Sequence, residues 1–160
     1  MSHPSLGLPP VDRHGGLPPA AARVDAARER LATRALEIAI DRDPTLRERN
    51  DEIRMRQLLR DTTVLLDRVV DAMAEGTPDP ARVFAEALAP MYRRRKVPLD
   101  DAINLCQSIR EAIGAALPVS EMAEVDAATE AMIGAFKWHR RLAGDGRKRN
   151  RLLQAIYKGA

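Results

Sequence analysis

Apolar residues recur at three- and four-residue spacing through most of the chain, which is the period of one face of an α-helix. This spacing predicts helices over about 20–42 and 44–75, separated where Asp43-Pro44 stops the first helix and caps the second. Gly76 is a natural end for the second helix. The expected inward positions are Val24, Ala27, Leu31, Ala35, Ile38, Ile53, Leu58, Leu59, Leu65, Leu66, Val69, Val70 and Met73.

Further helices are predicted in the second half of the chain. A third begins near Pro80 and should be kinked or split at Pro90, and a fourth opens at Leu99. A fifth is capped by Ser120 and is expected to end at Gly144-Asp145-Gly146. The expected inward positions are Val83, Phe84, Ala87, Leu88 and Met91, then Leu99, Ala102, Ile103, Cys106, Ile109, Ile113 and Ala116, then Met122, Val125, Thr129, Met132, Phe136 and Trp138.

The composition favours an all-α fold. Aromatic residues make up only 3% of the chain and β-branched runs are scarce, which excludes a β-sandwich or a Rossmann-type sheet. A length of 160 residues fits one domain, so we expect a single bundle of five to six helices over 20–144. Residues 1–19 contain five prolines and three glycines and are expected to form a disordered arm, and 145–160 a basic amphipathic C-terminal helix.

Charge is unevenly distributed along the chain. The formal net charge is +3, but from Lys137 onward eight Lys or Arg residues stand against Asp145 alone. The tail therefore carries +7 and the rest of the chain −4. A second basic run, 93–96, surrounds just over one helical turn, and a solvated helix end is favoured over a docking surface there.

No set of residues in the sequence predicts catalysis. The only histidines are His3, His14 and His139, which provide neither the base of a catalytic triad nor an i, i+4 metal pair. The segment 144–148 resembles a phosphate-binding loop only superficially. Adjacent carboxylates such as Asp100 and Asp101 suit the first turn of a helix. We therefore expect no catalytic residues, no metal, no cofactor and no enzymatic activity.

Two smaller features also favour structural roles. Cys106 is the only cysteine, so it cannot form an internal disulfide, and it is expected to be a small buried apolar residue. The pair Trp138-His139 is interpreted as a capping Trp beside a solvated His rather than as a tetrapyrrole site. The sequence has no signal peptide and no apolar stretch of membrane-spanning length, so a cytoplasmic location is expected.

The basic C-terminal segment is the candidate site. It could pack on its own bundle, dock on a partner helix or an acidic lipid surface, or contact nucleic-acid phosphates. The acidic body and the absence of a helix-turn-helix motif disfavour nucleic acid. The expected partner-binding residues are Arg147, Lys148, Arg149, Arg151, Leu152, Leu153, Ile156 and Tyr157.

The segment from Arg93-Arg94-Arg95-Lys96-Val97-Pro98-Leu99-Asp100-Asp101-Ala102-Ile103 to Ser108-Ile109-Arg110-Glu111-Ala112-Ile113 resembles the helical N-terminal domains of RsbR-type and PucR-type bacterial regulators. The similarity spans roughly 31–142. It implies a globin-like sensory or dimerisation module that normally precedes a STAS or helix-turn-helix output domain. Because no output domain follows in these 160 residues, we expect a regulator that acts alone or through a separate partner. A haem-binding role would need a proximal histidine, and the bundle before Lys137 has none.

These observations predict a bacterial regulatory or signalling module that acts by protein–protein interaction or as a homodimer. Self-association is suggested by apolar residues that fall off the main stripes, namely Leu36, Ile40 and Leu46. The alternative is an electrostatic binder of nucleic acid or acidic membrane through the C-terminal helix. A third hypothesis is a sensor with a small-ligand or tetrapyrrole pocket inside the bundle.

Overall fold

The computed structural model describes residues 16–158, with side chains placed through Ala143. Residues 1–15, which make up most of the predicted N-terminal arm, lie outside this range. Over the described residues the fold is all-α, as predicted, but it has seven α-helices rather than five to six. These are α1 (Pro19–Ala26), α2 (Arg28–Arg42), α3 (Thr45–Arg49), α4 (Glu52–Glu75), α5 (Asp79–Arg94), α6 (Leu99–Gly114) and α7 (Ala123–Lys158), with a short 3-10 turn, η2 (Val119–Glu121), before the last.

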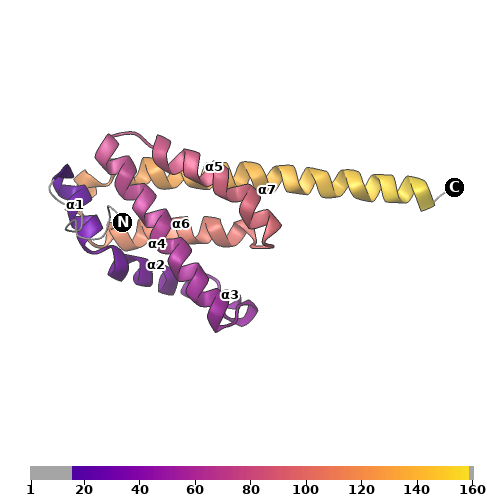
Figure 1. Cartoon of the computed structure of the whole chain (residues 1–160), viewed down its shortest axis with the longest axis horizontal. Helices are drawn as coiled ribbons and strands as arrows, with labels where there is room; N and C mark the ends of the chain where they lie inside the picture. The colour runs from indigo at the N-terminus through magenta and orange to yellow at the C-terminus, as the bar shows by residue number, and fades with distance from the viewer. Residues whose placement is uncertain (1–15, 159–160) are drawn as a thin grey trace, which may run out of the picture.

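α4, α5 and α6 pack around the first part of α7. The most extensive contacts join α2 to α6, α6 to α7 and α5 to α7, while α4 crosses the bundle and touches α1, α2, α5 and α7 (Figure 1). No helix within residues 16–158 is long and apolar enough to span a membrane. The centre of the core is filled by the fully buried side chains of Leu65, Leu66, Tyr92, Leu105, Ile109, Ile113, Met132 and Phe136.

Two predicted helices are each divided in two. The first changes direction at Ala27, which lets α1 pack on α4 while α2 packs on α6, and no Gly or Pro in the sequence marks this point. The second is interrupted at Asn50-Asp51. Asp51 caps α4 by accepting a hydrogen bond from the Arg54 amide at 2.8 Å. The Asn50 side chain closes α3 by donating to the Leu46 carbonyl at 2.7 Å. Asn and Asp both favour helix ends, so the sequence does indicate this boundary. The continuous apolar periodicity predicted a single helix instead.

Of the remaining predicted helix boundaries, some agree with the structure and others do not. Gly76 ends α4 in the left-handed conformation with φ 70°, and the amides of Gly76 and Thr77 both donate to the Ala72 carbonyl, which satisfies this carbonyl in the last turn of the helix. α5 continues through Pro90 without being split. Ser120 lies in η2 rather than capping α7, which begins at Ala123. The predicted break at Gly144-Asp145-Gly146 is wrong, because α7 is one helix to Lys158. A helical glycine costs about 1 kcal/mol relative to alanine, which weakens a helix without ending it.

The predicted inward faces are correct except on α5 and at helix ends. α5 buries the small residues Ala81, Ala85 and Ala89 together with Tyr92. The predicted face is instead mostly outside, with Val83 and Met91 exposed by 56% and 46%. Alanines at four-residue spacing form a narrow face that lets α5 pack closely against its neighbours, α4 and α7. Ile53, Ala116 and Trp138 were also expected inside and are exposed.

The residues that suggested self-association belong to the core. Leu46 is fully buried and Leu36 is buried. Ile40 is half-buried and packs against the core cluster. The reason for Leu46 is the break at Asn50: as a separate helix, α3 turns Leu46 inward, whereas on one continuous helix it would lie off the apolar stripe. These side chains therefore provide no argument for self-association.

Candidate interaction site

The most unusual feature of the fold is the length of α7. It has 36 residues, about 54 Å at 1.5 Å per residue. Its first part packs against α4, α5 and α6. Its C-terminal part, yellow in Figure 1, extends well past the other helices, and no other element of residues 16–158 lies beside it. The end of α7 is therefore a helix that the bundle does not cover.

The predicted partner-binding residues all fall on this extension. They are Arg147, Lys148, Arg149, Arg151, Leu152, Leu153, Ile156 and Tyr157. The backbone places them on one helix with the bundle, not on a separate terminal helix. Their side chains lie outside the described residues.

Two exposed apolar side chains lie on α7 just before the extension. Trp138 and Leu142 are exposed by 47% and 44%. They are four residues apart on α7 and follow the buried Ala135 by three and seven residues, which is close to one turn and two turns of the helix. Trp138 and Leu142 therefore lie along one edge of the core-facing side of α7. The Trp138 ring is tilted against His139, with 6.4 Å between ring centroids.

The structure brings the second basic run to the base of this extension. Arg93 and Arg94 end α5, Arg95 and Lys96 follow it, and all four are exposed. The connection to α6 that follows lies beside α7, because Arg140 on α7 forms an ion pair with Asp100 in the first turn of α6. Two basic segments that are distant in sequence thus meet at one end of the bundle.

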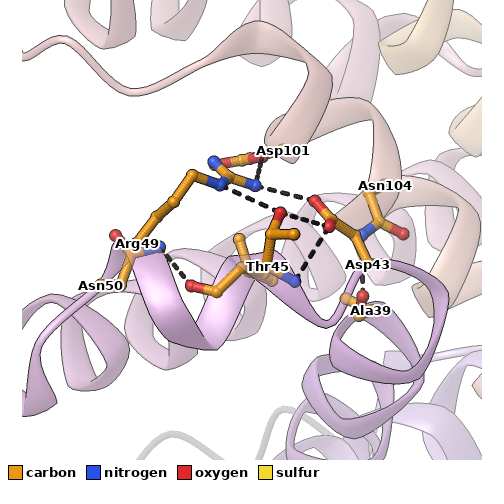
Figure 2. Close-up of polar contacts among 8 residues, drawn as sticks. Ala39, Asp43, Thr45, Arg49, Asn50, Asp101 and Asn104 are labelled. Atoms are coloured by element: carbon orange, nitrogen blue, oxygen red, sulfur yellow. Dashed lines mark hydrogen bonds and ion pairs between the residues drawn. The ribbon is translucent and has the colours of Figure 1, made fainter.

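The most extensive polar cluster joins α2, α3 and α6 (Figure 2). Arg49 donates two hydrogen bonds to the Asp101 carboxylate, at 3.1 and 3.2 Å, and a third to Asp43 at 2.7 Å. Asp43 also accepts from the Thr45 amide and hydroxyl, at 3.1 and 2.6 Å. Asn104 on α6 donates to the Ala39 carbonyl at 2.9 Å. The cluster therefore ties the α2–α3 corner to the start of α6.

Electrostatics in this cluster favour the charged forms. Hydrogen bonds from Thr45 and the nearby Arg49 charge lower the pKa of Asp43. Bonding to Asp101 raises the pKa of Arg49. The Asp101 side chain is only 6% exposed and has Arg49 as its partner. Because its carboxylate oxygens are both occupied by one arginine, the arrangement acts as a clamp and has no oxygen directed to a substrate.

Two buried ionisable groups elsewhere are held inert. Cys106 is fully buried, as predicted, and burial raises the pKa of its thiol to about 12. Tyr92 is fully buried and stacked on Phe136 with 6.3 Å between ring centroids. Burial, reinforced by the Asp61 carboxylate, raises the pKa of Tyr92 well above its usual range. Neither group is accessible to a reactant in this conformation.

The described residues contain no group of three His, Cys, Asp or Glu side chains able to hold a metal ion. A comparison with protein-family models finds no match to this chain, and a comparison with curated proteins finds none either.

Proposed function

We propose that this protein is a non-enzymatic regulatory or signalling module. Its partner, which is another protein or a second copy of this chain, binds the end of α7, residues 144–158, which we call the binding arm. The observation that carries this proposal is the continuation of α7 past the bundle (Figure 1). A helix whose far half has no neighbour in its own fold gains most of its stability on contact with a partner.

The residues of the arm suit such contact. The sequence there combines Leu152, Leu153, Ile156 and Tyr157 with a run of basic residues, which is the composition of an amphipathic helix that docks by its apolar positions. The exposed Trp138 and Leu142 extend the apolar character back to the bundle. The resemblance to RsbR-type and PucR-type domains supports the same reading, since those modules act through dimerisation and through other domains.

The test is whether the arm can be changed without affecting the folding of the bundle. The variant with Arg147, Lys148, Arg149 and Arg151 changed to Glu should keep the helicity and the melting temperature of the wild-type bundle, measured by circular dichroism. We expect light scattering to show association of the full chain and no association of this variant. A bundle that melts well below wild type in this variant would show that the end of α7 is part of the fold, and would overturn the proposal.

A second candidate is electrostatic binding to an acidic surface such as nucleic acid or anionic membrane. The specific observation in its favour is the meeting of the 93–96 run with the basic part of α7 at one end of the bundle. Binding of this type would weaken steeply between low and moderate salt, because it depends on release of counterions. Titration with a DNA duplex and with anionic vesicles at two salt concentrations would test it.

A further inference from the structure

The continuity of α7 fixes the register between its exposed residues near the bundle and those of the arm. Beginning with Trp138, positions on this helix separated alternately by four and three residues follow one line, which is the spacing of a coiled-coil seam. We call these positions the outer seam: Trp138, Leu142, Asp145, Arg149, Leu152 and Ile156.

The outer seam is symmetric about position 147. Consider a second copy whose α7 runs antiparallel to the first, with the two positions 147 opposite one another. Apolar seam positions of one copy then face apolar positions of the other, and the acidic position faces a basic one. The register pairs Trp138 with Ile156, Leu142 with Leu152, and Asp145 with Arg149. In heptad notation Trp138, Asp145 and Leu152 occupy d positions, and Leu142, Arg149 and Ile156 occupy a positions. Each pair therefore joins an a position to a d position, as in antiparallel coiled coils.

We propose that two copies of this chain associate through the outer seam of α7 as an antiparallel helix pair with its two-fold axis at position 147. The inference rests on the proposed role of the arm and names its partner as a second copy. The two bundles then lie at opposite ends of the pair.

Charge selects this arrangement over the obvious alternatives. In a parallel pair in register, Asp145 would face Asp145 and Arg149 would face Arg149, and like charges in contact are unfavourable. A register shifted by one heptad would place Asp145 or Arg149 against apolar residues, where each charge would be buried without a partner. Only the antiparallel register matches every position of the seam.

The remaining basic residues of the arm lie off the seam and determine the salt dependence. Arg147, Lys148 and Arg151 add positive charge to both copies, so the two arms repel one another at long range. Salt screens this repulsion, and self-association should tighten from low to moderate salt. Binding to DNA or anionic vesicles would weaken over the same range. The sign of the salt effect therefore separates the two kinds of partner.

Charge reversal in the full-length protein tests the register. Asp145→Arg and Arg149→Asp should each weaken dimerisation, measured by sedimentation equilibrium, on the order of tenfold or more. An equimolar mixture of the two variants should dimerise again, because each Arg of one chain then meets an Asp of the other. Lys137→Asp makes the same charge change at an exposed position of α7 off the seam and should leave the dimer intact. Equal loss in Lys137→Asp, or no recovery in the mixture, would overturn the inference.

Cysteine cross-linking tests the orientation. Because Cys106 is fully buried, introduced thiols should react alone. Leu142→Cys should not cross-link to itself under mild oxidation, whereas its mixture with Leu152→Cys should give a covalent dimer. Self-cross-linking of Leu142→Cys would indicate a parallel pair and refute the proposal. A wild-type protein that is folded but monomeric would also refute it, while leaving the arm available to another partner and the proposed function standing.

Discussion

Replacing Arg49 with Met should destabilise the fold, because the buried Asp101 carboxylate loses its hydrogen-bond and ion-pair partner. The Asp101 side chain is only 6% exposed, and Arg49 supplies both of its hydrogen bonds. Removing one partner of a fully buried ion pair costs about 3–5 kcal/mol. Because Arg49 itself is 41% exposed, water can reach one side of the pair, and we expect a loss of about 2 kcal/mol. For a chain of this length that corresponds to a fall in melting temperature of about 4–8 °C.

Urea denaturation followed by circular dichroism would measure this loss, with an unchanged m-value as the sign that only stability has changed. Asp101→Asn keeps the shape and removes the charge, and should cost about 1 kcal/mol. The double variant should cost less than the sum of the two, since Arg49 and Asp101 interact directly. The matched control is Arg56→Met, which removes an exposed i, i+4 pair with Glu52 and should cost under about 0.5 kcal/mol. If Arg49→Met is as mild as this control, the clamp does not hold α3 to α6.

Three further predictions concern the same corner and the α5–α6 connection. The lowered pKa of Asp43 contributes stability above the ordinary value of 3.8 that is lost as pH falls through the lowered pKa, so Asp43→Asn should flatten the acid end of a stability–pH profile. Leu46→Ala should cost about 2–4 kcal/mol in urea denaturation, because Leu46 is fully buried; a near-neutral result would place Leu46 outside the core. Lys96 has φ 58°, a conformation that favours glycine, so Lys96→Gly should raise the free energy of unfolding by up to about 1 kcal/mol, and a decrease would contradict this.

The sequence predicted the all-α class and most of the core because apolar periodicity reports burial directly. It predicted the wrong face of α5 because large apolar residues dominate such a pattern, whereas the buried face of α5 consists mainly of Ala81, Ala85 and Ala89. The clamp could not be predicted in the same way. Arg49 and Asp101 are 52 residues apart, and a pair at that separation depends on how α3 and α6 are packed, which no local pattern encodes.

The expected helix end at Gly144-Asp145-Gly146 had the largest consequence for function. With a break there, the rotation between Trp138 and the arm would be undefined, and Leu152 and Ile156 would be isolated apolar residues on a short basic helix. In one continuous helix, Ile156 follows Trp138 by 18 residues, about five full turns, so the two lie on the same side of α7. The two glycines weaken the arm by about 1 kcal/mol each relative to alanine. Contact along the outer seam would compensate for that loss, and we therefore expect the arm to be most helical in the associated state.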